Sequence, residues 1–240
     1  MKKLILAAVM VMTVSALQAK VTLQSGSGAF MNEAGTTALL KFNFDDCVVV
    51  SYQAGKVVKD FGTLYEYIES LQLEKDKVIP QSNGYDLARA QFNKANKKGL
   101  KLVASEESIV AHKKALNPDP ETDAKTAKKL AKADKMLTKF GYCWDDSNVK
   151  YEIIVHADTI SAGNAAAGAF FGKAIPGADG GSAMIGWVEV IDRASHDVVC
   201  EAHIGKFYGA GGYTFQLRLW NVLGTCILKE LPDIKKLTGK

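Results

Sequence analysis

The chain has 240 residues, of which 48% are apolar and 23% are charged, and these values are ordinary for a soluble globular protein. The basic residues are almost all lysine, with arginine only at positions 89, 193 and 218, and the net charge is only +4. This mild charge and the scarcity of arginine argue against a surface that binds nucleic acid. No long linker rich in Pro, Gly or Ser divides the sequence, so we expect residues 20–240 to form a single domain.

The first nineteen residues have the pattern of a signal peptide. Lys2 and Lys3 form a charged start, Leu4–Leu17 is an apolar stretch too short to span a bilayer, and Ala19 is a small residue at a plausible cleavage position. No cysteine follows this stretch directly, so a lipid-modified N-terminus is not expected. Cleavage after Ala19 lowers the net charge to +2. We therefore predict a protein that is exported to the periplasm or secreted.

The first half of the remaining chain predicts strands and then helices. Residues 20–36 are polar and rich in Gly and Ser, which predicts a flexible N-terminal arm. Thr37–Phe44 alternates apolar and polar side chains and predicts a strand, which Val48–Tyr52 either continues after a kink or follows as a short separate strand. Apolar spacing predicts helices at Asp60–Leu73, Tyr85–Lys98 and Ser105–Leu116, and a short strand at Leu100–Val103.

Asp119–Phe140 gives the longest helical signal, with Asp119 as its cap and Pro120 in the first helical position. Much of its surface is lysine, at positions 125, 128, 129, 132, 135 and 139. A basic amphipathic helix can lie against anionic lipid headgroups or an acidic partner. The alternative is a solvated outer helix whose lysine stems cover apolar surface, and we favour it because the apolar stripe is rich in Ala and lacks Trp.

The strongest strand signals lie in the C-terminal half. Val149–Ile160 alternates with period 2, and Ala183–Gly205 predicts a long β-hairpin. Matching the apolar faces of the two hairpin arms places even-numbered residues opposite even-numbered ones, which requires an odd-length loop around Arg193–His196. The connection Ser161–Ser182 is rich in Gly and Ala and is longer than most, a length typical of functional or mobile loops.

An amphipathic helix at Thr214–Leu231, after a Gly-rich turn at Tyr208–Tyr213, closes the chain, and Pro232 is expected to stop it. Arg218 within its apolar run indicates that this helix packs on a sheet and does not cross a membrane. We expect its apolar stripe to cover the hairpin face that carries Val188. Together these elements predict an α+β fold, an α/β sandwich with a mixed, largely antiparallel sheet and helices packed on one face.

One set of polar residues has the composition of a metal site. His156 and Asp158 share a face of the Val149–Ile160 strand, and Glu189, Glu201 and His203 share a face of the hairpin. If the strands are neighbours and the faces coincide, this set suits zinc, manganese or iron. A metal-dependent hydrolase that uses His156, Asp158, Glu201 and His203 is therefore one alternative function.

The same face also carries apolar residues, namely Ile154, Trp187 and Val199. Alternating polar residues are what a half-exposed antiparallel sheet shows without any chemistry. The chain also lacks a nucleophile elbow, and no cysteine is flanked by an activating His. We therefore favour a non-catalytic protein with no cofactor.

The four cysteines permit two disulfides in three pairings. Cys200 and Cys226 fall on predicted apolar faces and fit packed thiols, whereas Cys47 and Cys143 each lie beside a predicted strand end. Cys47 with Cys143 is therefore the candidate disulfide.

Phe170 and Phe171 in the Ser161–Ser182 loop can anchor that loop to the core, to a membrane surface or to a neighbouring subunit. Packing on the protein itself is the default expectation. A membrane-interacting oligomer that uses this loop is a further alternative function.

The chain resembles a group of uncharacterised exported proteins of Bacteroidetes in its export signal and in the segments TALLKFNFDD, FNKANKKG, KYEIIVHADTISAG and GWVEVIDRASHDVVCEAHIG, followed by a terminal helix. More distantly, the order of strand, crossover helices, hairpin and closing helix is similar to the periplasmic α/β domains of the curli-secretion lipoprotein and the N-terminal domain of the Tol system. Those relatives imply envelope assembly or secretion and homo-oligomers. The chain lacks the lipid-bearing cysteine of the curli-type proteins, and no functional residue is carried over.

The combined expectation is an exported, non-catalytic envelope protein, a binding or assembly component of the periplasm or the outer-membrane periphery. Its expected partner is another envelope protein or a second copy of itself, with at most peripheral membrane contact and no nucleic acid. The Ser161–Ser182 loop and the basic Asp119–Phe140 helix are the expected contact surfaces.

Overall fold

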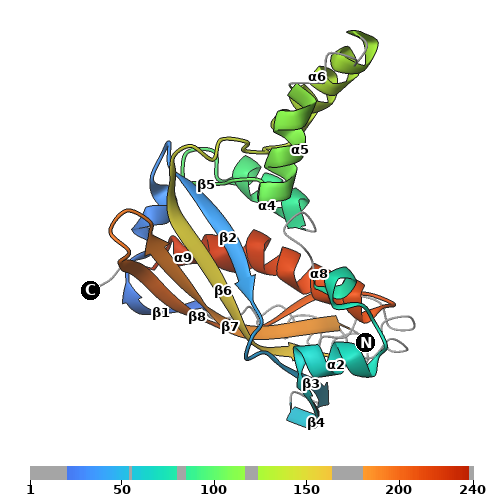
Figure 1. Ribbon diagram of the computed structural model, residues 1–240. Helices are drawn as coiled ribbons and strands as arrows, with labels where there is room; N and C mark the ends of the chain where they lie inside the picture. Colours follow the sequence, from blue (N-terminus) through green and yellow to red (C-terminus); the bar gives the residue numbers. More distant parts are fainter. Residues whose placement is uncertain (1–20, 54–55, 80–84, 117–123, 164–180, 238–240) are drawn as a thin grey trace, which may run out of the picture.

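A computed structural model describes residues 21–53, 56–79, 85–116, 124–163 and 181–237 of the chain. The predicted signal peptide, Phe170 and Phe171 lie outside these residues. Within them, eight strands form one mixed, largely antiparallel sheet, and helices pack on one of its faces (Figure 1). The fold is therefore α+β, as the sequence predicts.

The sheet strands follow the order β1-β8-β7-β6-β2-β5, and β3 pairs with both β6 and β4. The strands are β1 (Val21–Gly26), β2 (Thr37–Asn43), β3 (Val48–Gln53), β4 (Lys56–Thr63), β5 (Lys101–Leu102), β6 (Val149–Ser161), β7 (Gly181–Asp192) and β8 (Val198–Gly211). The helical elements are η2 (Gly28–Asn32), α2 (Leu64–Ser70), α3 (Lys75–Val78), α4 (Asp86–Ala95), α5 (Glu106–Leu116), α6 (Ala124–Lys139), α8 (Phe215–Thr225), η5 (Cys226–Glu230) and α9 (Leu231–Ile234).

Strand β6 is the centre of the sheet, and its side chains alternate between buried and more exposed positions along its length. One edge of β6 pairs with β7 in antiparallel fashion. The other edge pairs in parallel first with β2, up to Asn43 opposite His156, and then with β3, from Val48 opposite Thr159. Strands β2 and β3 therefore continue one another along the same edge, separated by the turn that contains Cys47.

Strands β7 and β8 form the predicted hairpin in the predicted register. Gly186 lies opposite Ile204, Val188 opposite Ala202 and Val190 opposite Cys200, so even-numbered positions face even-numbered ones over this stretch, and the register shifts at both of its ends. The loop between the strands has five residues, 193–197. The parity follows from the apolar pattern because a shift by one residue would turn the buried side of one strand outward.

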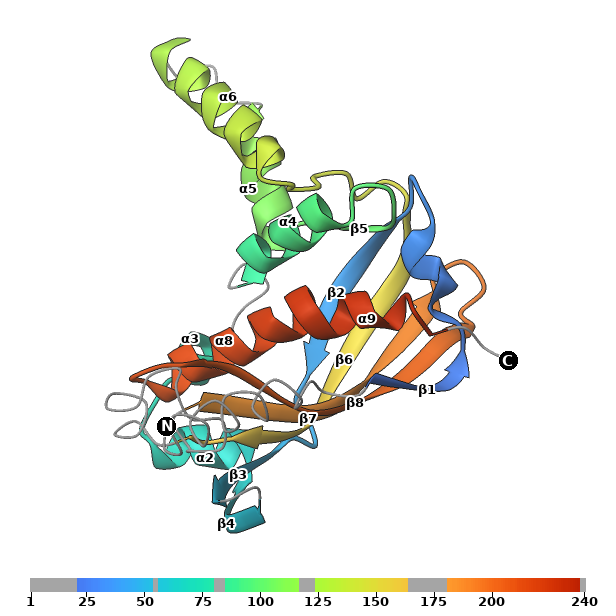
Figure 2. The ribbon, with the colours of Figure 1, turned by 180° about the vertical axis from the view of Figure 1, so that it is seen from behind.

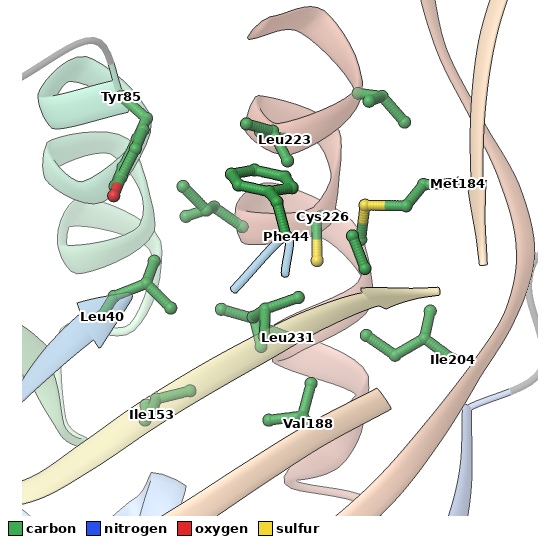
Figure 3. Close-up of a cluster of buried hydrophobic side chains, with 14 of the residues drawn as sticks. Leu40, Phe44, Tyr85, Ile153, Met184, Val188, Ile204, Leu223, Cys226 and Leu231 are labelled. Carbon is green, nitrogen blue, oxygen red and sulfur yellow. The ribbon is translucent and has the colours of Figure 1, made fainter. Parts of the chain in front are cut away.

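The C-terminal helix closes the core over this hairpin (Figure 2). Leu223 and Cys226 are fully buried and point toward Met184 and Val188 of β7 (Figure 3). This packing was predicted from the two apolar patterns. The contact is close, since a Cβ atom at Gly209 of β8 would lie 2.6 Å from the backbone of α8.

The same helix is longer than the sequence predicts. Pro232 does not stop it at Leu231, because the chain continues through the π-helical turn η5 into α9, with the proline in the first turn of α9. A proline is tolerated there because the N–H groups of a first turn need no intrahelical acceptor. The predicted Gly-rich turn at Tyr208–Tyr213 is also corrected, since β8 runs to Gly211.

The predicted flexible arm at residues 20–36 is wrong from Val21 onward. Strand β1 pairs with β8, and the short helix η2 is capped by Ser27, whose side chain accepts a hydrogen bond from the Ala29 N–H. Phe30 and Met31 of η2 are buried in the core. Few apolar residues mark this segment in the sequence, because a strand at the sheet edge needs mainly backbone hydrogen bonds.

The predicted helix Asp60–Leu73 begins later, at Leu64. Thr63 and Glu66 form a capping box, in which each side chain bonds the backbone N–H of the other residue. The residues before Thr63 form β4, an exposed outer strand that pairs with β3. The helical spacing of Phe61 and Leu64 is therefore accidental, because Phe61 belongs to the strand.

Candidate functional site

The five predicted metal-site residues share the sheet face opposite the helices. They are His156 and Asp158 on β6, Glu189 on β7, and Glu201 and His203 on β8. All five side chains are half-buried or exposed. The condition stated in the sequence analysis, that the strands are neighbours and these faces coincide, is met.

Trp187 separates the two histidines on this face. The strand register places His156, Trp187 and His203 in one row across β6, β7 and β8. Because neighbouring strands lie about 4.8 Å apart, the two histidine backbones are roughly 10 Å apart. The indole ring stacks on His156 with 3.8 Å between ring centroids and an interplanar angle of 2°. To bind one metal ion, His156 and His203 would have to approach each other, but the Trp187 ring lies between them and stacks on His156.

The carboxylates of the face have other contacts. Glu189 and Glu201 lie directly opposite each other on β7 and β8. The Ser25 hydroxyl donates a 2.6 Å hydrogen bond to Glu201, and Glu189 Oε2 lies 3.5 Å from His156 Nε2. Burial raises the pKa of Asp158, and the two histidines partly offset this rise.

Among the described residues, no group of three or more His, Cys, Asp or Glu side chains is placed to hold a metal ion. The five residues are therefore of types that bind metal ions, but their side chains do not come together around one point. The face combines apolar and polar side chains in rows, as a half-exposed antiparallel sheet does.

The predicted disulfide between Cys47 and Cys143 is not formed, since all four cysteines are free. Cys47 precedes β3, which pairs with the Thr159 end of β6. The Cys143 carbonyl accepts a hydrogen bond from Ala104, which follows β5 at the opposite end of the sheet. Ten strand residues span about 33 Å, whereas a disulfide requires Cα atoms within about 7 Å. Both residues do lie near strand ends, as predicted, but the ends are opposite ones.

Cys200 and Cys226 fit the prediction of packed thiols, and Cys47, which was predicted to form a disulfide, is also a packed thiol. Cys47, Cys200 and Cys226 are buried, and burial raises the thiol pKa of Cys47 to about 12 and that of Cys200 to about 11. Cys143 is half-buried, and burial raises its pKa as well. None of these thiols has the lowered pKa of a nucleophilic or redox-active cysteine.

A second candidate surface is the helix pair, which we define as α5 and α6 (residues 106–116 and 124–139). The pair projects away from the sheet in both views (Figures 1 and 2). His112 of α5 binds Asp134 of α6 at 2.9 Å, and the Trp144 ring stacks on His112 with 4.2 Å between centroids. The two helices and Trp144 therefore hold one another together beyond the body of the protein.

A buried polar cluster attaches the helix pair to the sheet. Asp86 and Arg89 of α4 form a buried ion pair at 2.7 Å. The Asp86 carboxylate also accepts hydrogen bonds from the Ser105 N–H at 3.0 Å and from the Ser108 hydroxyl, at the start of α5. Arg89 in turn donates to the Leu40 carbonyl of β2 at 2.9 Å. The sequence offers no signal for this cluster, because its members lie in three separate elements.

Helix α6 carries six exposed lysines on one side, which we call the lysine stripe. They are Lys125, Lys128, Lys129, Lys132, Lys135 and Lys139. At 100° per residue they occupy about a third of the helix circumference over a length of about 21 Å. Asp134 lies on the opposite side, toward α5. Among the ion pairs of the described residues, none includes a lysine of this stripe.

Two exposed apolar residues form what we call the apolar border: Met136 lies within the arc of the stripe at 100° per residue, and Phe140 directly follows α6 at its C-terminal end. Met136 is 54% exposed and Phe140 is 50% exposed. The sequence interpretation favoured a solvated outer helix whose lysine stems cover apolar surface. In the structure α6 packs on α5 away from the sheet (Figures 1 and 2), and its six lysines are exposed. An exposed helix is compatible with both alternatives stated for this segment.

None of the helices in the described ranges combines the length and the apolar character that a membrane crossing needs.

The comparisons with known proteins carry no argument about this chain. No family model and no curated protein sequence matches the chain. Among solved structures, the chain is similar to the PelC dodecamer from Paraburkholderia phytofirmans, with 11% identity, a TM-score of 0.35, and coverage of 92% of this chain and 100% of that one. A variant of the same PelC dodecamer gives 13% identity, a TM-score of 0.33, and coverage of 91% and 98%. At these scores the similarity carries no conclusion about activity or assembly, so the function is argued from the chain itself.

Proposed function

We propose that this protein is an exported, non-catalytic envelope protein that binds or assembles with another envelope component through its helix pair. The observation that carries the proposal is the projection of α5 and α6 from the sheet with the lysine stripe facing outward. Among the side chains of the two helices whose burial is described, Ile109 is the one buried hydrophobic residue. Through the side chains whose burial is described, these two helices contribute little to the core, and contacts outside the core would explain their projection.

Two further observations support the proposal. The sequence of residues 1–19 has the charged start, apolar stretch and small residue of a signal peptide. On the open sheet face, His156 contacts Trp187 and Glu189, and Glu201 accepts a hydrogen bond from Ser25. Among the described residues, no group of His, Cys, Asp and Glu side chains is placed to hold a metal ion. The first observation favours export, and the second favours binding over metal-dependent hydrolysis.

The proposal is tested by fractionation and site-specific photo-crosslinking in the native cell. Mass spectrometry of the envelope fraction is expected to find a chain that begins after Ala19. A photo-reactive residue at Lys132 is expected to capture an envelope protein or lipid, whereas the same residue at Lys235, an exposed position on the body, is not. An uncleaved chain in the cytosol, or equal capture at both positions, would contradict the proposal.

A further inference from the structure

We propose that the lysine stripe of α6 binds the surface of a bilayer that contains anionic phospholipids. This inference rests on the proposed function and names the chemistry of the partner. It starts from the charge of α6, which has six lysines and one acidic residue, Asp134. Since Asp134 is paired with His112 on the side toward α5, the outward side of the helix is uniformly positive.

The type of basic residue favours a diffuse anionic surface. A lysine ammonium is a hydrated point charge on a flexible stem, whereas arginine is preferred where single phosphates or carboxylates are bound in a fixed bidentate geometry. The stripe contains lysine alone. Lysines that lie near an anionic bilayer each add to the attraction without needing a defined partner group.

The position of α6 favours a flat partner. The helix pair projects beyond the sheet (Figures 1 and 2), and the lysine stripe lies on the side of α6 opposite Asp134, which faces α5. A flat partner can therefore contact the stripe on the side of α6 that α5 does not cover. The stripe is about 21 Å long, so its charges would contact several lipid headgroups together.

The apolar border of the stripe favours a bilayer over a soluble acidic polymer. Met136 and Phe140 are about half exposed beside the lysines. At a bilayer, side chains of this type insert into the boundary between headgroups and acyl chains while the lysines remain among the phosphates. A soluble polyanion offers no apolar phase to either side chain.

The test is co-sedimentation of the purified mature chain with vesicles. Vesicles of phosphatidylcholine with about one-third phosphatidylglycerol are expected to bind the protein, and vesicles of phosphatidylcholine alone are not. Binding is expected to weaken strongly at high salt, because exposed charges are screened.

Substitutions in the stripe identify the surface. The triple variant Lys128→Gln, Lys132→Gln and Lys135→Gln is expected to lower the partition coefficient by about a hundredfold. The matched control is Lys56→Gln, Lys97→Gln and Lys235→Gln, three exposed lysines on the body that change the net charge equally. The control is expected to lower binding by less than about fivefold, the general effect of net charge.

Met136→Ser with Phe140→Ser tests the apolar contribution, with an expected loss of about tenfold in binding. Circular dichroism and thermal unfolding of each variant establish that it is folded. The proposal is overturned if the native chain does not bind anionic vesicles, or if the control triple loses as much binding as the stripe triple. It is also overturned if the Met136 and Phe140 changes have no effect and soluble polyglutamate displaces the protein, since the partner is then an acidic polymer.

Failure of this inference is distinguishable from failure of the proposed function. The crosslinking experiment detects any envelope component at Lys132, whereas the vesicle experiment detects lipid binding alone. Capture of an envelope protein without vesicle binding would therefore retain the proposed function and reject the bilayer.

Discussion

Asp86 is the residue on which the attachment of the helix pair depends most directly. Its carboxylate is buried, pairs with Arg89 and accepts hydrogen bonds from Ser105 and Ser108. A buried carboxylate needs this many partners because its removal from water is otherwise costly. The same contacts fix the start of α5 relative to α4.

Substituting Asp86→Asn is expected to lower the free energy of unfolding by about 3 kcal/mol, because Arg89 stays buried after losing its carboxylate partner. Urea denaturation measures the change. The double variant Asp86→Asn with Arg89→Met is the control, and it should lose less stability than the sum of the two single variants. Additive losses would show that the ion pair contributes no coupling.

Glu230 is a second buried charged residue, located in the π-helical turn η5. Burial raises its pKa from 4.5 to about 7, the nearby Asp233 adds to the rise, and Lys229 opposes it. Between pH 4.5 and about pH 7, the Glu230 carboxyl group loses its proton in the unfolded chain but keeps it in the folded chain. A rising pH therefore favours unfolding over this interval.

We expect the stability of the native chain to fall from pH 5 to pH 8, with a contribution from Glu230 of up to about 3 kcal/mol. Glu230→Gln removes this titration, so the variant should show a flatter pH profile and exceed the native chain in stability at pH 8. Urea denaturation at both pH values gives the comparison. Parallel profiles for the two proteins would be inconsistent with a raised Glu230 pKa.

At the scale of the elements, the contact between α8 and β8 sets the spacing of helix and sheet. A Cβ atom at Gly209 would lie 2.6 Å from the backbone of Val222, which cannot move without the helix. Gly224 in α8 has nothing within 4 Å of its Cβ position. A side chain is therefore excluded at Gly209 but has room at Gly224, and the sequence alone does not reveal this difference.

Gly209→Ala is expected to lower stability by about 1–3 kcal/mol, since α8 must shift from the sheet. Gly224→Ala is the matched control and is expected to raise stability by about 0.5–1 kcal/mol, because alanine favours the helix and meets no neighbour. Thermal unfolding of both variants tests the pair. A loss at Gly224 as large as that at Gly209 would refute the steric explanation.

The sequence correctly predicts the elements whose apolar residues face the core at regular spacing. It does not predict the elements in which this apolar pattern is weak. The register of β7 and β8 follows from the parity of their buried residues. Strands β1 and β4 lie at sheet edges, where backbone pairing needs no apolar alternation, and both were missed.

The candidate surfaces also differ in how much of each the sequence predicts. The lysines of α6 are evident in the sequence, but the projection of the helix is not, because an apolar stripe does not say whether it packs on a sheet or on another helix. The Asp86 cluster joins α4, α5 and β2, and no local pattern connects residues so far apart. The sequence could state only as a condition that the five residues of the sheet face share one face, and the separation of the two histidines by Trp187 required the register.

For the molecule as a whole, the free cysteines predict how the chain responds to thiol reagents. Under native conditions, iodoacetamide should label Cys143 slowly and leave the three buried thiols unmodified, because burial raises the pKa of all four. In denaturant, mass spectrometry should count four labels on a chain that has not been reduced. Two labels in denaturant would show that a disulfide is present.

The pairing of β1 with β8 also constrains when the native structure can form. Ser25 and Glu201, whose side chains form a hydrogen bond, are 176 positions apart in the sequence. Strand β2 likewise pairs with β6, which follows much later in the chain. The sheet therefore closes only when nearly all of the polypeptide is available, and such long-range pairing is slow. During the export proposed above, the segment that emerges first would stay unfolded until the later strands follow it.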